Sequence, residues 1–223
     1  MKKFIAMLLA LVMVLSLAAC GAKEEAPAAN AEAPAAEAGA IKLGMCGPLT
    51  GGAAVYGTAV QAGMQIAVEE INAKGGIQFA LNTQDDEHDT EKAANAYNAL
   101  KDWGMQIMAG PVTTAPSNVV AAECANDEIF MLTPSASGVS VIEYGDNIFQ
   151  ICFTDPNQGV ASADYMAQKN LGETIGVIYD SSDVYSAGIF EKFQAQAAAN
   201  GLNVACVEAF TADNKADLTT QIT

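Results

Sequence analysis

"IKLGMCGPLTGGAAVYGTAVQAGMQIAVEEINAKGG", residues 41–76, contains the pattern that decides the fold class. The apolar run at 41–46 has the length of a strand, and a glycine-rich segment at 47–57 follows it directly. Apolar residues then recur at helical spacing through 57–73, and the sequence AKGG predicts the end of that helix. A strand, a glycine loop and a helix in this order indicate the first part of a strand–helix–strand unit.

The same alternation continues to the end of the chain. Further runs of strand length lie at 77–84, 105–110, 129–134, 148–153, 174–179 and 202–210. Stretches with helical spacing lie between or after them, at 90–103, 115–126, 157–169, 186–200 and 216–223. Strands that alternate with helices predict a parallel sheet covered by helices on both faces, which is an α/β fold.

The turn cluster TDPNQG divides this series in two. We therefore expect an N-terminal α/β lobe at 41–154, followed at 155–223 by a crossover and the start of a second α/β lobe. This second lobe has only two strands, and no cap or glycine closes its last helix. We expect the second lobe to be incomplete and the chain to be the N-terminal part of a longer protein.

The N-terminus has the features of a secretory signal. Two lysines precede an apolar segment at 4–17, and small residues precede Cys20. This pattern resembles a bacterial lipoprotein signal, with residues 1–19 removed and Cys20 lipidated. The alternative is a transmembrane helix, but the run is short for a bilayer crossing of about 20 residues. Residues 20–40 are rich in Ala, Pro and Glu and predict a disordered tether, so the protein is expected at the extracytoplasmic face of the cell membrane.

The composition is strongly acidic. The net charge is −16, and the sequence contains no Arg. Such a surface repels nucleic acid and lacks the Arg clamps typical of phosphate sites. Of five cysteines, four lie in the globular part, far apart and without a C-x-x-C motif. Buried free thiols are favoured there over a disulfide framework or a zinc site, and no metal or cofactor is expected.

The glycine loop at 47–57 does not match a phosphate-binding motif. A P-loop requires a Lys directly after its last glycine, and the first Lys that follows this loop is Lys74. A dinucleotide fingerprint requires the spacing G-x-G-x-x-G, which is absent, although Asp85 and Asp86 do end the second predicted strand. The loop is therefore expected to line a pocket of another kind.

Two further loops follow predicted strands, at 109–118 and 132–140. Because the carboxyl ends of parallel strands meet at one edge of the sheet, all three loops should line one rim. They bring together hydroxyl groups and free backbone amides, at Tyr56, Thr113, Thr114, Ser135 and Ser137. Pro116 suits the first turn of a helix with Thr114 or Ala115 as its N-cap, and such an N-terminus can bind one carboxylate. The alternative is that these hydroxyls only cap their own helices.

Several segments together resemble the branched-chain amino-acid-binding proteins, which are type I periplasmic binding proteins of ABC importers. They are the opening segment at 41–77, then DDEHDTEKAANA, AGPVTTAPSNVVAA, FMLTPSAS and TDPNQG. The resemblance extends over 41–223. It implies two lobes that close over a ligand through three hinge strands, with TDPNQG at the first crossover. It is less specific for the ligand, since relatives bind amides, urea, aromatic acids and other small solutes.

The resemblance also implies roles for individual residues. Hydroxyls at Thr114 and Ser137 would hold the α-carboxylate of the ligand, assisted by backbone groups at Val112 and Ser135. Tyr56 would pack on the ligand side chain, and Tyr185 would close the site from the second lobe. The acid that usually binds the ammonium group would lie beyond the last residue. Many relatives carry a disulfide at the positions of His88 and Thr113, which this chain lacks.

His88 and Trp103 are not expected to bind a metal or the ligand, and the sequence does not indicate an enzyme. His88 is the only histidine and lies among acidic residues, which favours a solvated loop over a metal site. Trp103 is expected to pack under the sheet. No G-x-S-x-G motif accompanies the single histidine, so an enzyme is not expected.

We therefore expect a monomeric, lipid-anchored binding protein that captures a small amino acid of the branched-chain type for an ABC import permease. One alternative is a receptor for an amide, urea-like or other small solute on the same scaffold. Another is a sensory ligand-binding domain that does not transport.

Overall fold

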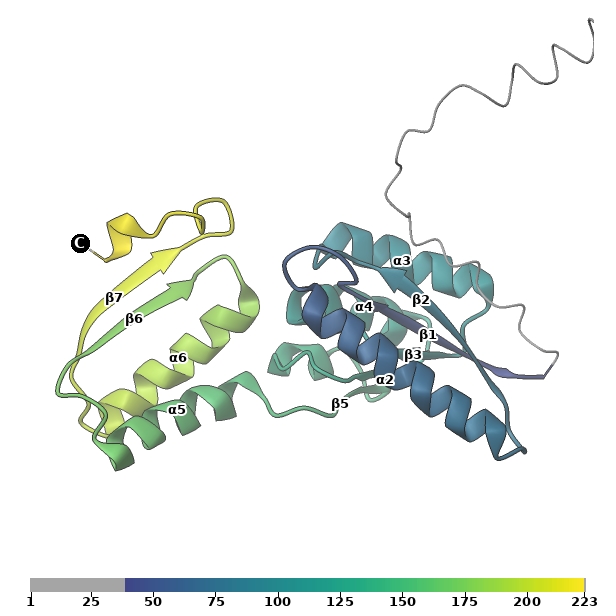
Figure 1. Cartoon of the computed structure of the whole chain (residues 1–223), viewed down its shortest axis with the longest axis horizontal. Helices are drawn as coiled ribbons and strands as arrows, with labels where there is room; N and C mark the ends of the chain where they lie inside the picture. The colour runs from purple at the N-terminus through teal and green to yellow at the C-terminus, as the bar shows by residue number, and fades with distance from the viewer. Residues whose placement is uncertain (1–38, 223) are drawn as a thin grey trace, which may run out of the picture. The chain divides into compact units, whose positions relative to one another are not determined.

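The computed structural model describes residues 39–222 and contains two parallel sheets flanked by helices (Figure 1). The strands of the first sheet have the order β2-β1-β3-β4-β5: β1 (Ile41–Gly47), β2 (Phe79–Asp85), β3 (Ile107–Ala109), β4 (Phe130–Thr133) and β5 (Ile148–Gln150). The second sheet pairs β6 (Ile175–Asp180) with β7 (Val204–Phe210). The predicted α/β fold is confirmed. The predicted signal at 1–19, Cys20 and most of the tether lie outside the described residues.

The register of β1 and β2 brings the ends of both strands to the same level. Ile41 pairs with Phe79, and Gly47 at the end of β1 pairs with Asp85 at the end of β2. Met45 and Cys46 are completely buried within β1. The loops that leave these two strands therefore start side by side at one edge of the sheet.

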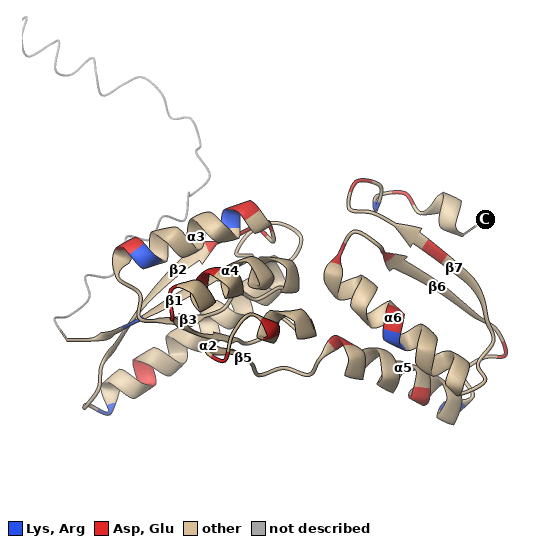
Figure 2. Ribbon diagram, turned by 180° about the vertical axis from the view of Figure 1, so that it is seen from behind, with Lys and Arg blue, Asp and Glu red and all other residues tan. Residues whose placement is uncertain are grey.

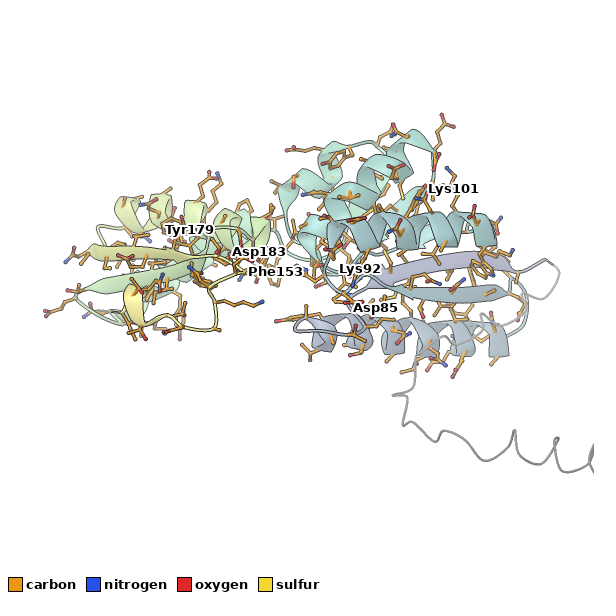
Figure 3. All side chains as sticks on the ribbon, turned by 90° about the horizontal axis from the view of Figure 1, so that it is seen from above. Asp85, Lys92, Lys101, Phe153, Tyr179 and Asp183 are labelled. Atoms are coloured by element: carbon orange, nitrogen blue, oxygen red, sulfur yellow. The ribbon has the colours of Figure 1, made fainter. Side chains whose placement is uncertain are left out.

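Helices cover both faces of the first sheet. The helix α2 (Ala54–Ala73) lies on one face, and α3 (Thr90–Trp103) and α4 (Thr114–Asn126) lie on the other (Figure 1, Figure 3). The main core forms beneath α3 and α4, and its fully buried side chains include Tyr97, Leu100, Met108, Val120, Cys124, Met131 and Val141. Trp103 packs against this core, as predicted.

The ends of α3 follow from its sequence. Asp89 is the N-cap, and its side chain accepts a hydrogen bond from the Lys92 N–H at 2.9 Å. Gly104 ends the helix with a φ of 90°, a left-handed conformation that glycine adopts easily. These two signals explain why the predicted range of 90–103 matches the observed helix.

The second sheet has its own helices and its own core. The helices α5 (Asp155–Lys169) and α6 (Val184–Ala199) pack against each other on one face of the β6–β7 pair (Figure 1). Ala163, Ile175, Phe193 and Ala197 form the buried centre of this unit. Tyr179 also stacks on Phe190 with ring centroids 4.2 Å apart.

Three expectations about local structure were wrong. Residues 216–222 of the helix predicted at 216–223 do not form an α-helix, and only a 3₁₀ turn, η2 (Thr219–Gln221), is present there. The Asp217 side chain accepts hydrogen bonds from the N–H and hydroxyl of Thr219, and this local pairing competes with a helix. The strand predicted at 148–153 ends at Gln150, and Cys206 is exposed rather than buried. A 3₁₀ helix, η1 (Val139–Glu143), was not predicted.

Acidic residues predominate over both parts of the fold (Figure 2). The sequence holds 26 Asp and Glu against 10 Lys. Within residues 39–222, no helix combines the length and apolar character needed to cross a membrane.

Gly57 allows α2 to lie close to the glycine loop. A Cβ atom at this position would lie 2.1 Å from the carbonyl oxygen of Pro48, which is part of the loop backbone. Backbone cannot move aside as a flexible side chain can. Gly63 occupies the same helix two turns later, and a Cβ there would meet no atom within 4 Å.

We expect Gly57→Ala to lower the free energy of unfolding by about 1–3 kcal/mol, because the added methyl group overpacks the contact with Pro48. Gly63→Ala is the matched control. It should raise the free energy of unfolding by up to about 1 kcal/mol, since alanine favours the helix. Urea unfolding followed by circular dichroism measures both. Equal effects of the two substitutions would contradict the close approach at Gly57.

Candidate functional site

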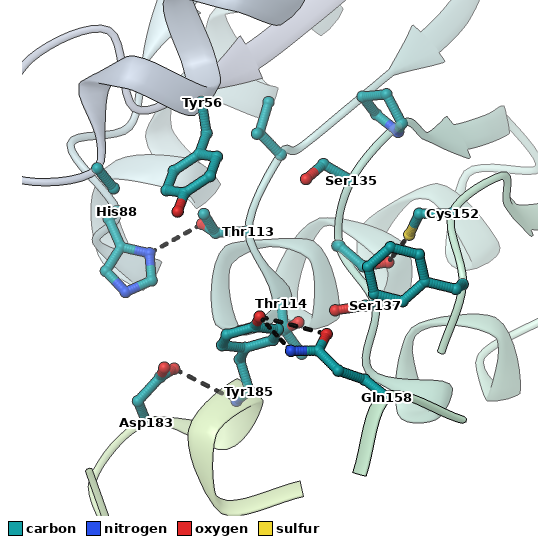
Figure 4. A pocket seen from close by; sticks show the side chains of 15 residues that line it. Tyr56, His88, Thr113, Thr114, Ser135, Ser137, Cys152, Gln158, Asp183 and Tyr185 are labelled. Carbon is teal, nitrogen blue, oxygen red and sulfur yellow. Dashed lines mark hydrogen bonds between the residues drawn. The ribbon is translucent and has the colours of Figure 1, made fainter. Parts of the chain in front are cut away.

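A pocket lies where the loops after β1, β3 and β4 meet residues of α5 and α6 (Figure 4). Its cavity volume is about 350 Å³, within the range of small-molecule sites. The lining consists of Ala53, Tyr56, His88, Val112, Thr113, Thr114, Pro134, Ser135, Ala136, Ser137, Cys152, Phe153, Gln158, Asp183 and Tyr185. The carboxyl edge of the first sheet therefore carries this concavity, as expected for an open parallel sheet.

All seven residues named from the sequence as ligand residues line this one pocket. They are Tyr56, Val112, Thr113, Thr114, Ser135, Ser137 and Tyr185. Their contact with a ligand remains a prediction. The sequence interpretation missed the other lining residues, among them His88, Phe153, Gln158 and Asp183. Gln158 lies within the segment TDPNQG, and Asp183 lies two residues before Tyr185, so proximity to a predicted motif or site residue was the available signal.

The backbone amides of the glycine loop donate hydrogen bonds to a carboxylate of the protein itself, that of Asp85. Asp85 accepts hydrogen bonds from the N–H of Leu49 at 2.8 Å and from the hydroxyl of Thr50 at 2.6 Å. It also accepts one from the N–H of Glu87 at 2.9 Å. Partial burial raises the pKa of Asp85, but the hydrogen bonds, led by the one from Thr50, outweigh this effect and lower it below its usual value. Since this carboxylate occupies loop amides, the loop is not a phosphate cradle.

Thr114 and Ser137 form the floor of the pocket and are almost fully buried, with 2% and 4% of their surface exposed. The hydroxyl of Thr114 accepts a hydrogen bond from the N–H of Gly138 at 3.3 Å, so its own proton remains available to a ligand. Gly138 is required beside it, because a Cβ there would lie 2.4 Å from the Thr114 methyl group. This packing fixes the direction of the hydroxyl.

Two backbone amides add donors to the same region. In the described part of the chain, the N–H groups of Val112 and Ser135 donate to no other residue. Thr114 begins α4, whose first-turn amides have no intrahelical partners. Together these groups form a neutral set of donors, and no Lys contributes to the pocket lining among residues 39–222.

The N-cap of α4 differs from the prediction. Thr113 is the cap, one residue before Thr114, and its side chain makes no capping hydrogen bond. Its hydroxyl instead lies 2.9 Å from Nδ1 of His88 (Figure 4). His88 and Thr113 are the two positions at which the resemblance implies a disulfide in many relatives, and here a contact between their side chains takes its place. Although His88 is exposed in a loop, as predicted, it also lines the pocket.

Asp155, at the start of α5, is a buried carboxylate next to the floor of the pocket. Only 2% of it is exposed, and its N–H donates to the carbonyl oxygen of Ser137 at 2.9 Å. Its Oδ1 has no hydrogen-bond partner in the described structure. Burial raises the pKa of Asp155, a hydrogen bond from Ser137 counteracts this, and the negative charge of Asp183 raises it further.

Aromatic rings form the outer wall. Tyr56 on α2, Phe153 after β5 and Tyr185 on α6 all line the pocket and all remain partly exposed. The hydroxyl of Tyr185 on α6 lies 3.1 Å from Nε2 of Gln158 on α5. This contact between the two helices orients the tyrosine ring. Asp183 caps α6 through long contacts of 3.3 and 3.4 Å to the N–H groups of Tyr185 and Ser186 (Figure 4).

The chain therefore combines two α/β units with a largely neutral pocket at the strand ends. The family model described as periplasmic binding protein matches residues 40–223. The chain belongs to this family.

Its relatives and fold neighbours are similar over most of the described residues. The Leu/Ile/Val-binding protein BraC3 of Rhizobium johnstonii is 32% identical over 201 residues, which cover 87% of this chain and 54% of that protein. The substrate-binding protein LivJ of Streptococcus pneumoniae, solved with isoleucine, has a TM-score of 0.75 and 27% identity, covering 81% of this chain and 52% of that one. The chain spans about half the length of the curated relatives it matches.

A more distant structure shares only the fold. A solute-binding protein of R. palustris in complex with 4-hydroxybenzoate has a TM-score of 0.73 and 21% identity, and it covers 80% of this chain and 49% of that one. The fold alone therefore does not determine the ligand.

Asp86 holds the loop that carries His88. It is completely buried, its Oδ1 accepts a hydrogen bond from the His88 N–H at 2.9 Å, and its Oδ2 has no partner in the described structure. The pKa of Asp86 is raised to about 6: burial is the largest cause, the hydrogen bond from the His88 N–H opposes it, and the charges of Asp85 and Asp89 add to it. Because the pKa is higher in the folded state, protonation of Asp86 stabilises the fold at low pH, and this contribution is lost as the pH rises through about 6.

We expect Asp86→Asn to be more stable than the unmodified protein at pH 8, by up to about 2–3 kcal/mol, because the amide removes a buried charge and keeps the acceptor for His88. The difference should shrink as the pH falls from about 6 toward 4, where both side chains are neutral. Urea unfolding at several pH values measures it. Asp85→Asn is the matched control, and it should be less stable at pH 8, since a carboxylate with a lowered pKa stabilises the fold when charged.

Proposed function

We propose that this chain is part of an extracytoplasmic solute-binding protein that captures a small amino acid of the branched-chain type. The observation that carries the proposal is the neutral donor set at the floor of the pocket, formed by the Thr114 hydroxyl and the free amides of Val112 and Ser135. Neutral donors at a helix N-terminus suit a single carboxylate, and hydrogen bonds to a charged group are the strong kind.

The positively charged ammonium group of an amino acid has a candidate partner in Asp155. Asp155 is buried beside Ser137, and one of its oxygens lacks a hydrogen bond. A buried carboxylate without a partner is costly in the free protein, and an ammonium group that pairs with it offsets that cost. Ser137, between this carboxylate and the pocket, can contribute its hydroxyl to either end of the zwitterion.

A large part of the remaining lining suits an apolar side chain. Ala53, Val112, Pro134 and Phe153 present hydrocarbon surface, and Tyr56 and Tyr185 add aromatic faces. When such a pocket closes over a ligand, water is expelled and its polar contacts become stronger. Closure is driven only by the additional affinity of the ligand for the closed form.

In the cell, we propose that lipidated Cys20 anchors a monomer to the outer face of the cell membrane and that the protein delivers its ligand to an ABC import permease. The N-terminal signal pattern and the family membership support this assignment. The tether at 20–40 would leave the binding unit free to move between solvent and permease.

We expect the full-length protein to bind leucine, isoleucine or valine. A ligand at 100 times its Kd should raise the free energy of unfolding by about 2.7 kcal/mol, which a thermal-shift screen of the common amino acids detects. Calorimetry then gives the Kd. Thr114→Val with Ser137→Ala should weaken binding by about 3 kcal/mol, roughly 100-fold, because each lost hydrogen bond to a charge costs about 1.5–3 kcal/mol.

The control removes two hydroxyls outside the pocket. The hydroxyls of Thr58 and Ser162 bond only to carbonyl oxygens of their own helices, at 2.7 and 2.8 Å. Thr58→Val with Ser162→Ala should bind normally. No response to any of the three amino acids rejects the branched-chain assignment, whereas a response to amides or aromatic acids supports another solute. Unchanged affinity in the first double variant rejects the proposed carboxylate site.

We expect Asp155→Asn to have opposite effects on the free protein and on amino-acid binding. It should raise the melting temperature of the free protein at pH 7.5, because burial disfavours the charged carboxylate. It should weaken leucine binding by about 10-fold or more, because the ammonium group loses its charged partner. Calorimetry with 4-methylpentanoate, which is leucine without its ammonium group, provides the comparison. Equal loss of affinity for both compounds would show that Asp155 does not bind the ammonium group.

A further inference from the structure

His88 is held in a conformation that only a well-defined loop can maintain. Glu87 and His88 are consecutive residues with φ values of 49° and 62°. These values lie in the left-handed region of the backbone, which residues other than glycine adopt uncommonly. Asp85 and Asp86 fix these two residues through hydrogen bonds from their N–H groups, each 2.9 Å long, and Asp89 caps α3 immediately after them. Residues held in such conformations often belong to binding sites.

The imidazole ring is fixed at one nitrogen and open at the other. Nδ1 lies 2.9 Å from the hydroxyl of Thr113, and that hydroxyl caps no helix and has no other acceptor in the described structure. When the Thr113 hydroxyl donates its proton to Nδ1, the imidazole carries its own proton on Nε2. Nε2 has no partner among residues 39–222, and the ring lines the pocket (Figure 4).

An acceptor lines the same pocket. The carboxylate of Asp183 bonds to its own helix only through contacts of 3.3 and 3.4 Å, so it retains lone pairs for a ligand. A ligand hydroxyl group can accept a hydrogen bond from Nε2 of His88 or donate one to Asp183, since both residues line the pocket. A methyl group in its place would remove water from His88 and Asp183 without forming a hydrogen bond to either. Burying polar groups without a hydrogen-bond partner is unfavourable.

From this arrangement we infer that His88 determines specificity by favouring a branched side chain that carries a hydroxyl over its hydrocarbon isostere. Threonine and valine are that pair, since they have the same shape and differ only in one hydroxyl. The inference rests on the proposed amino-acid site and specifies its ligand class. In the branched-chain set, threonine binds more tightly than valine.

Calorimetry of the full-length protein with threonine and valine tests this inference. Threonine should have a Kd about 10-fold lower than valine, the ratio given by one additional satisfied hydrogen bond. In His88→Leu and His88→Phe, which lack a ring N–H, the ratio should fall to about one. His88→Gln retains an N–H donor and should restore most of the preference. Two apolar replacements are used so that a folding defect in one leaves the comparison intact.

Glu87→Gln is the matched control in the same loop, because Glu87 pairs only with the exposed Lys92 and does not line the pocket. Its ratio should equal that of the unmodified protein. A valine affinity equal to or greater than that of threonine overturns the inference, as does a ratio that survives in His88→Leu and His88→Phe. If leucine binds in either case, the proposed function stands and only the role of His88 fails. Failure of every branched amino acid to bind overturns both.

Discussion

The carboxylate of Asp85 joins the loop after β1 to the loop after β2, and the geometry of the pocket depends on this connection. Parallel pairing places Asp85 opposite Gly47, so its side chain reaches the amides of the glycine loop directly. The same carboxylate bonds to Glu87 and so starts the turn that carries His88. This one acidic residue thereby bonds to the loop that leads to Tyr56 and to the turn that carries His88, and both residues line the pocket (Figure 4).

The proposed carboxylate site suits an acidic protein without Arg, because its donors are neutral. A carboxylate ligand is repelled at long range by a net charge of −16, but salt screens this repulsion beyond about 8 Å at physiological ionic strength. At close range the proposed carboxylate site offers the Thr114 hydroxyl and unpaired amides, and Asp183 is the one acidic residue of the lining among residues 39–222. These dipoles are fixed by the fold and need little reorganisation on binding, so a formal positive charge is not required.

Much of the fold could be predicted because its signals are local. Apolar runs located the seven strands found within residues 39–222, and the helical spacing of apolar residues predicted α3 at its observed range of 90–103. The prediction failed where local hydrogen bonds compete with periodicity. At 216–223 the spacing of Leu218 and Ile222 suggested a helix, but the side chain of Asp217 bonds to Thr219 and a single 3₁₀ turn results.

The candidate site was predictable only where a residue type implies its use. Hydroxyls after strands indicated Thr114 and Ser137, whereas nothing in the sequence separates His88 from a solvated loop residue, because its position depends on two left-handed residues and the Thr113 hydroxyl. Buried carboxylates are equally hidden in a sequence with 26 acidic residues. Asp86 and Asp155 each keep an oxygen without a partner in the described structure, one beneath the His88 loop and one beside the pocket floor. Such groups lower the stability of the fold, because a buried carboxylate oxygen without a hydrogen bond has lost its hydration without compensation.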